Sequence, residues 1–375
     1  MLEALQDAQF SKPTGMQKTL GDLVELQRGF DLTADERQPG TIPVIGGGGP
    51  NGFHATANVR GPGVALARSG SGFGNAWWVD TDFWAHNTIM FVKNFKGNDS
   101  KYVYYVLDWV DFSKHNSGGA QPSLNRNFIY PIPIHIPPLP EQRKIAEILR
   151  TWDLGVEKLE ALRAAKEQQL EGFAAQLFHK AQAEKQYLRE HLTEVSERNR
   201  GQCVARVLSV TNSAGFVPAE DQFAHRVASA DISNYKIVRQ GQYAYNPSRI
   251  NVGSIARLDD WSEGALSPMY VVFELHETLD SDYFSHWLRT GEARKRIGLA
   301  AQGSVRDTVS FGDLSSIPVP IPPLEAQQQI ARALSSAKKE LSLLKSEIDL
   351  LTRQKRGLMQ KLLTGEWRVQ VEEAA

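Results

Sequence analysis

The sequence has little of several residue types that would indicate a particular class of protein. Its single cysteine, Cys203, excludes an intrachain disulfide and any cysteine-rich zinc site. No apolar run reaches the roughly 18 residues that a membrane-spanning helix needs. The opening MLEALQDAQF is acidic and lacks the residue order of a secretory signal peptide. These absences favour a cytoplasmic protein without a membrane segment.

The chain also lacks an excess of charge of either sign. Its 42 basic and 43 acidic residues give a net charge of −1, which provides no overall attraction to nucleic acid. A DNA-binding role would therefore depend on the local arrangement of charge. With 375 residues, the chain is long enough for two or more domains.

One short sequence motif, called the phrase below, occurs twice in the chain. IPPLPEQRKIAEIL occupies 136–149 and IPPLEAQQQIARAL occupies 321–334, at an offset of 185 residues. At the same offset, Gly118 upstream corresponds to Gly303. A period of this length is far greater than that of a solenoid repeat. It indicates a duplicated half-molecule in which a globular part is followed by a helix.

Each copy of the phrase leads into a long predicted helix. Its apolar residues recur at alternating steps of four and three, the 3.5-residue period of a coiled-coil seam. The first seam consists of Ile145, Leu149, Trp152, Val156, Leu159, Leu170, Phe173 and Leu177, and the second of Ile330, Leu334, Ala337, Leu341, Leu344, Ile348, Leu351, Leu358 and Leu362.

Basic residues interrupt these seams at Arg163, Lys166 and Lys355. Their long aliphatic stems can lie along an apolar seam. We expect the two helices to pair antiparallel with each other. Two alternatives are unrelated amphipathic helices, each packed on its own domain, and prolines that serve as a ligand for an SH3-like partner.

The predicted fold class is α+β, with two α/β recognition domains, each followed by a long helix, and a pseudo-two-fold antiparallel coiled coil. Short β-like runs such as TIPVI, GVALA and YVVFEL alternate with glycine in both globular parts. Helical stretches are predicted near 100–112 and 281–297. The predicted segments are an N-terminal segment 1–16, domain one 17–135, helix one 136–186, domain two 187–320, and helix two with a tail 321–375.

Several fragments resemble enzyme motifs but lack the neighbouring residues that those motifs require. GGGPNG at 47–52 fits G-x-G-x-x-G, but the residues after it do not open a helix, so a glycine hairpin or loop is favoured. NPSR at 246–249 lacks the second proline and the aromatic residue of the amino-methyltransferase motif. The nine histidines show no metal-ligand spacing. No catalytic or metal-ligating residue is predicted.

The loops of both globular parts instead carry arginine and amide side chains beside glycine and serine. Arg, Asn and Gln form paired hydrogen bonds to base edges, whereas serine, lysine and backbone N–H groups contact phosphates. The simpler interpretation of each residue is a solvated loop side chain. The candidate DNA contacts are Arg68, Ser69, Ser71, Asn75, Asn87, Asn116, Gln121, Arg126, Asn246, Arg249, Asn251, Gln302 and Arg306.

Together these features resemble the specificity subunit of Type I restriction–modification systems. The resemblance rests on the repeated I-P-P-L phrase, the Q-x-x-I-A-x-x-L helix start, and the closing QKRGLMQKLLTGEWRV at 354–369. It covers almost the whole chain and is weakest within the globular parts. Ala326 departs from the pattern, because the first copy has Glu141 at this position.

The resemblance implies a non-catalytic chain that reads a split site on double-stranded DNA. It implies two methyltransferase subunits bound to the helices, which use S-adenosylmethionine, and added motor-nuclease subunits. No cofactor is expected in this chain itself. Partner contacts are expected on free polar helix faces, at Glu141, Gln142, Arg143, Glu147, Gln327 and Gln328. The alternatives are a coiled-coil adaptor and a methyltransferase or nuclease with its own recognition domains.

Overall fold

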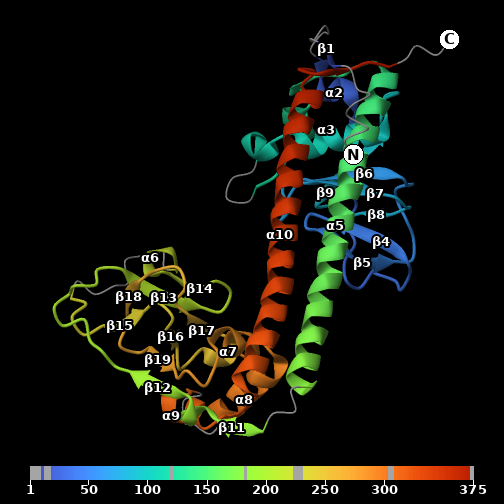
Figure 1. The fold of residues 1–375 in the computed structure, drawn as a ribbon. Helices are drawn as coiled ribbons and strands as arrows, with labels where there is room; N and C mark the ends of the chain where they lie inside the picture. The colour runs from blue at the N-terminus through green and yellow to red at the C-terminus, as the bar shows by residue number, and fades with distance from the viewer. Residues whose placement is uncertain are drawn as a thin grey trace. The chain divides into compact units, whose positions relative to one another are not determined.

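The chain divides into two units that share its two long helices. Unit 1 comprises 1–161 and 346–375, and unit 2 comprises 162–345. Helix α5 (Leu139–Lys180) and helix α10 (Leu324–Leu363) each contribute a segment to both units (Figure 1). The structure, a computed structural model, describes residues 10–11, 18–117, 122–180, 184–222, 231–302 and 308–371.

Unit 1 contains two small sheets. The first has the strand order β3 (Glu25–Arg28), β9 (Ile89–Asn94), β6 (Gly63–Ala67), β7 (Ala76–Val79), and the second has the order β5 (Gly49–His54), β4 (Ile42–Gly46), β8 (Trp84–Ala85). Strand β6 is the predicted GVALA run and is buried throughout. The GGGPNG segment forms the β4–β5 hairpin, with Gly46 opposite Gly49, which confirms the expectation of a hairpin there.

Unit 2 repeats this plan. Its first sheet has the order β12 (Leu192–Val195), β19 (Val271–Leu275), β16 (Tyr243–Tyr245), β17 (Ile255–Arg257), and its second has β14 (Gly215–Pro218), β13 (Val207–Thr211), β18 (Glu263–Leu266), β15 (Lys236–Arg239). Each second sheet is built around one parallel pair, β4 with β8 and β13 with β18. The duplication inferred from the sequence is therefore also a duplication of topology.

A helix follows the sheets in each unit, α3 (Ser100–Trp109) in unit 1 and α7 (Ser281–Trp287) in unit 2. Asp99 and Asp280 cap their N-termini through side-chain hydrogen bonds. The predicted helix 281–297 is in fact two helices, α7 and α8 (Gly291–Gln302). The break occurs because the Thr290 hydroxyl accepts a hydrogen bond from Ala293 N at 3.1 Å and starts the second helix.

Pro133, Pro318 and Pro320 lie in short strands, whereas the prolines directly before the long helices, Pro137, Pro138, Pro322 and Pro323, lie between these strands and the helices. Strand β10 (Pro133–Ile134) pairs with β2 (Lys18–Thr19), and β20 (Pro318–Pro320) pairs with β11 (Lys185–Tyr187). These strands are paired within the fold, and the Pro137 and Pro322 carbonyls accept hydrogen bonds from Gln142 and Gln327, which favours prolines that act as structural spacers. The remaining short elements are β1 (Phe10–Ser11), β21 (Arg368–Val369), α2 (Leu20–Leu23), α4 (Arg126–Ile129), α6 (Ala219–Gln222), α9 (Phe311–Ser315) and the 3-10 helices η1 (Phe112–His115), η2 (Leu188–Glu190) and η3 (Ile250–Val252).

The predicted seams line the pairing of the two long helices within each unit. In unit 1 the cluster around Ile145 and Leu149 of α5 includes Leu358 and Leu362 of α10. In unit 2 Leu177 of α5 packs against the cluster that includes Ile330 and Leu334 of α10, among other residues. The start of one helix therefore lies beside the end of the other, as the antiparallel prediction requires. The alternative of two unrelated helices is excluded.

Two of the three basic interruptions of the seam, Lys166 and Lys355, form ion pairs between the helices, whereas Arg163 pairs with Glu167 on its own helix. Lys355 pairs with Asp153 in unit 1, and Lys166 Nζ lies 2.6 Å from Glu340 Oε1 in unit 2. The Lys355 side chain is only 16% exposed, so its stem lies along the seam as expected. In the part of the chain that the structure describes, no helix is both long and apolar enough to cross a lipid bilayer.

Candidate nucleic-acid interface

Unit 1 has a hollow lined by three arginines. Its volume is about 450 Å³, and its walls include Arg28, Arg68 and Arg126. Serine and amide side chains complete it, and no carboxylate is among the lining residues. We call this the arginine hollow. A cluster of guanidinium groups of this kind can bind a base edge or a phosphate.

Arg68 is held at the centre of this arrangement by both its backbone and its side chain. It follows β6 directly, and its carbonyl accepts a hydrogen bond from Leu124 N at 2.8 Å. Its guanidinium donates to Asn87 O at 3.3 Å and to Ser123 Oγ at 3.1 Å. Burial lowers the pKa of Arg68, and the positive charge of Arg28 lowers that pKa further. A bound anion or acceptor would relieve this repulsion.

The other two arginines come from distant parts of the chain. Arg126 opens helix α4 and donates from Nη1 to Leu26 O at 3.0 Å. Arg28 ends strand β3, which pairs with β9. Sequence analysis identified Arg68 and Arg126 but missed Arg28, because nothing local in ELQR indicates that β3 borders this hollow.

The remaining candidates of unit 1 are not among the residues that line the hollow. Ser69 is half-buried, whereas Ser71, Asn75 and Asn116 are exposed. Asn116 Oδ1 accepts from Ser123 N at 2.9 Å and so shapes one wall. The Asn87 amide donates to Asp31, and among the described residues its buried Oδ1 has no partner. Gln121 lies outside the described residues.

Unit 2 presents its candidate loop at the corresponding place. Residues 246–254 connect β16 to β17, as 68–75 connect β6 to β7, and Val309 N donates to Pro247 O as Leu124 N does to Arg68 O. Arg249 and Asn251 are exposed on this loop. Asn246 is only 9% exposed, and its Oδ1 accepts from Ser248 N. It therefore shapes the loop that presents Arg249. Arg306 and the Gln302 side chain lie outside the described residues.

The two helix starts are built by one repeated set of hydrogen bonds. Gln142 Oε1 accepts from Asp99 N at 2.9 Å, and Gln327 Oε1 accepts from Asp280 N at 2.7 Å. In each case the amide nitrogen donates at 2.9 Å to the first of the two preceding prolines, Pro137 O or Pro322 O. Each glutamine thus joins its long helix to the domain before it.

The expectation that Glu141, Gln142 and Gln327 remain free for a partner is wrong. They are 4%, 2% and 1% exposed, respectively, because they hold the fold together. Glu141 pairs with Arg368, which explains the departure at Ala326. Glu141 serves the first helix start in particular, since it binds both Arg368 and the Val369 N–H of the strand that carries them. Arg143 and Glu147 are exposed and Gln328 is half-buried, so these three stay open to a partner.

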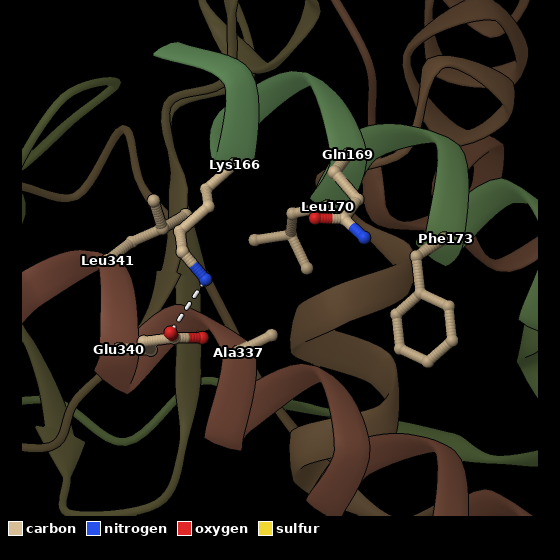
Figure 2. Close-up of a pocket in the computed structure, with 7 residues that line it drawn as sticks. All are labelled: Lys166, Gln169, Leu170, Phe173, Ala337, Glu340 and Leu341. Carbon is tan, nitrogen blue, oxygen red and sulfur yellow. Dashed lines mark hydrogen bonds and ion pairs between the residues drawn. The ribbon is translucent and has the colours of Figure 1, made fainter. Parts of the chain in front are cut away.

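A groove between the long helices in unit 2 offers a second kind of surface. Its volume is about 300 Å³, and it is lined by Leu170 and Phe173 of α5 and by Leu341 of α10. The Lys166–Glu340 ion pair closes one side (Figure 2). Phe173 is 39% exposed although it lies in the predicted seam. Here the two helices leave apolar surface uncovered.

Comparison with known proteins places this architecture. The chain matches the model of the family described as the Type I restriction modification DNA specificity domain, at residues 13–171 and 239–353. It is 22% identical over 341 residues to the Type I restriction enzyme MjaVIII specificity subunit of Methanocaldococcus jannaschii, covering 82% of this chain and 79% of that protein. It is 24% identical over 144 residues to the EcoprrI specificity subunit of Escherichia coli, covering 37% of this chain and 36% of that protein.

Solved structures share the fold. The S subunit of a Type I restriction–modification system from M. genitalium superposes with a TM-score of 0.59 at 17% identity, covering 93% of this chain and 96% of that one. A chain from a study of complex assembly and conformational transition in the type I R-M system superposes with a TM-score of 0.57 at 16% identity, covering 94% and 99%. At these identities the likeness concerns the fold alone.

Proposed function

This chain belongs to the Type I restriction–modification DNA specificity family, and from that premise we propose that it supplies the sequence recognition of a Type I restriction–modification complex. The observation that carries this proposal is the repeated topology. Both units have the same first-sheet order and the same glutamine-anchored helix start. One recognition unit would read each half of a bipartite site.

The chemistry of recognition would come from loops and not from a catalytic centre. Arg68 in unit 1 and Arg249 in unit 2 lie in loops that join equivalent strands. An arginine that pairs with guanine through two hydrogen bonds contributes about 1–3 kcal/mol of discrimination. The chain itself would catalyse no reaction, and S-adenosylmethionine would bind to the methyltransferase subunits.

Two methyltransferase subunits would dock on the long helices, and motor-nuclease subunits would join them. Support comes from surface that the fold leaves open. Leu343 and Leu350 of α10 are 62% and 56% exposed, and their spacing of seven residues places both on one face of the helix. Arg143, Glu147 and Gln328 supply exposed or half-buried polar groups for the same contacts.

The test is the methylation pattern of cells that express the methyltransferase subunits with or without this chain. We expect methylated adenines in one bipartite motif, present only when the chain is expressed. The purified chain alone should bind DNA weakly and with little sequence preference, because partners would supply much of the phosphate contact. A methylation pattern that does not depend on the chain would contradict the proposal. Transfer of labelled methyl groups by the purified chain would favour the alternative of a self-contained methyltransferase.

A further inference from the structure

Unit 2 has a second hollow, on the side where its sheets meet α7 and α10. Its volume is about 610 Å³. One wall is the turn between β13 and β14, with exposed Asn212 and Ser213, and another is the end of the candidate loop, at Val252 and Gly253. Four cationic side chains line it, namely Arg257, Arg289, Arg294 and Lys338. We call it the cationic hollow.

Three of these four cations are not neutralised within the fold. Arg257 is paired with Asp259 at 2.6 Å and with Asp282 at 2.8 Å. Arg289, Arg294 and Lys338 form no ion pair with a carboxylate in the described part of the chain. Asp259 and Asp260 also line the hollow, but Asp259 is already committed to Arg257. Positive charge therefore remains in excess on this surface.

The free cations also repel one another. Loss of water around the ammonium lowers the pKa of Lys338, the charge of Arg289 lowers it further, and Asp259 partly opposes both effects. Repulsion among three unpaired cations around one hollow raises the free energy of the folded protein, and a bound anion would lower it.

The fold itself does not require these charges. Asp153 of unit 1 occupies the place of Lys338 at the 185-residue offset. The equivalent caps Asp99 and Asp280 align α3 with α7, which puts Asp108 at the place of Arg289. Unit 1 thus has acidic residues at these two positions, where Asp153 accepts a hydrogen bond from the Tyr105 hydroxyl at 2.6 Å and pairs with Lys355. The cations of unit 2 call for a different explanation.

We propose that the cationic hollow holds a phosphodiester of the DNA backbone next to the bases that face loop 246–254. This inference rests on the proposed function. Arg289, Arg294 and Lys338 supply charge-assisted hydrogen bonds, and the Asn212 and Ser213 side chains supply neutral ones. The backbone is the source of phosphate because the loop that carries Arg249 also forms a wall of the hollow. Unit 1 has acids at this place, so the two units grip the backbone differently.

The test uses the chain assembled with its methyltransferase subunits and a duplex that contains the methylated motif. Binding is measured at several salt concentrations for the wild type and for Arg289→Ala/Arg294→Ala/Lys338→Ala. Each lost phosphate contact removes about 0.9 from the slope of log affinity against log salt. We expect the slope to become shallower by about one, as the loss of one phosphate contact requires, and affinity at low salt to fall about tenfold or more, with the methylated motif unchanged.

A matched control removes the same charge from neighbouring exposed positions that do not line the hollow. Lys295 lies on α8, which carries Arg294, and Arg332 and Lys339 lie on α10, which carries Lys338. The triple alanine variant of these three residues should keep the wild-type slope. Lys338→Asp introduces the residue that unit 1 has, so it should weaken binding more than Lys338→Ala. Normal assembly with the methyltransferase subunits shows that each variant is folded.

Several results would overturn the inference. If the hollow variant kept the wild-type slope, or lost no more than the control, the hollow would not bind the backbone. If inorganic phosphate stabilised the wild type but not the hollow variant, and the DNA slopes agreed, the site would belong to a free phosphate ligand. If wild-type complexes showed no sequence preference at all, the proposed function itself would fail, which is a distinct outcome.

Discussion

Glu141 and Arg368 lie 227 residues apart in sequence and form a two-pronged ion pair. Arg368 Nε donates to Glu141 Oε1 at 2.8 Å, and Nη2 donates to Oε2 at 2.5 Å. Glu141 Oε1 also accepts from Val369 N at 3.0 Å. The two side chains are 5% and 18% exposed. This pair joins the first helix start to the last strand of the chain.

Glu141→Ala should therefore destabilise unit 1 strongly. The substitution removes the carboxylate that accepts hydrogen bonds from the Arg368 guanidinium and the Val369 N–H, and removing one member of a buried pair costs about 3–5 kcal/mol. We expect a loss near 3 kcal/mol in the free energy of unfolding measured with urea. Glu147→Ala on the same helix is the control. Its carboxylate forms only an exposed pair with Lys144, so its loss should stay below about 1 kcal/mol. Equal effects of the two substitutions would contradict this account.

Arg68→Ala and Arg249→Ala should each relax one half of the methylated motif. Loss of a paired contact to a base lowers discrimination by about 1–3 kcal/mol at one position. Sequencing of methylated sites should show a degenerate base in one half for Arg68→Ala and in the other half for Arg249→Ala. Arg60→Ala, which removes an exposed arginine that does not line the hollow, should leave the motif intact. Weaker methylation with unchanged specificity would reassign the arginine concerned to a phosphate.

Unit 2 should lose stability in mild acid because of His286. Burial lowers its pKa to about 4, Arg289 and Lys338 act in the same direction, and Asp282 opposes them. Its Nε2 lies 2.9 Å from Ser335 Oγ. Between pH 4 and the ordinary value of 6.5, the unfolded chain binds a proton here that the folded chain does not. Stability should therefore decline as the pH falls through this window.

His286→Gln should flatten that decline, as measured by thermal unfolding across the same pH range. His179→Gln removes an exposed histidine from α5 and should leave the pH dependence unchanged. A wild-type profile that is flat from pH 6.5 to 4 would show that His286 does not act in this way.

The spacing between half-sites should follow the length of the helices. Helices α5 and α10 contain 42 and 40 residues, or roughly 60 Å each at about 1.5 Å per residue. Seven residues inserted after Leu159 keep the seam in phase and add about 10 Å. We expect the methylated motif to gain about one to three base pairs between its halves, given 3.4 Å per base pair. Two inserted residues should rotate the seam and abolish methylation. An active seven-residue variant with the original spacer would refute the idea that the helices act as a ruler.

The features that could be predicted from the sequence are those with a local period. Steps of three and four placed Leu334, Ile348 and Leu358 on a seam, and all three are buried there. The buried roles of Gln142 and Gln327 could not be predicted in this way. On a helix each appears as an ordinary polar residue, and its partner in the preceding domain, Asp99 or Asp280, lies more than 40 residues away. The break at Thr290 could have been predicted, since threonine is a favoured residue at a helix N-cap.

The candidate site likewise contains some residues that the sequence predicts and others that only the fold brings together. Arg68 and Arg126 stand out because glycine, serine and asparagine surround them in the sequence. Arg28 comes close to them only because β3 pairs with β9. A contact between residues so far apart in the sequence cannot be predicted from a local pattern. The cations of the cationic hollow come from β17, α8, α10 and the segment between α7 and α8, so only the fold brings them together.

The discontinuous make-up of unit 1 has a consequence for biosynthesis. Unit 2 is one continuous stretch, 162–345, whereas unit 1 needs residues from both ends of the chain. Its core includes Leu358 and Leu362, and Glu141 can form its ion pair only after Arg368 has been synthesised. Since a ribosome delivers the N-terminal part first, the first half emerges with the apolar face of α5 still bare. The unit that is translated first is thus the last to finish folding.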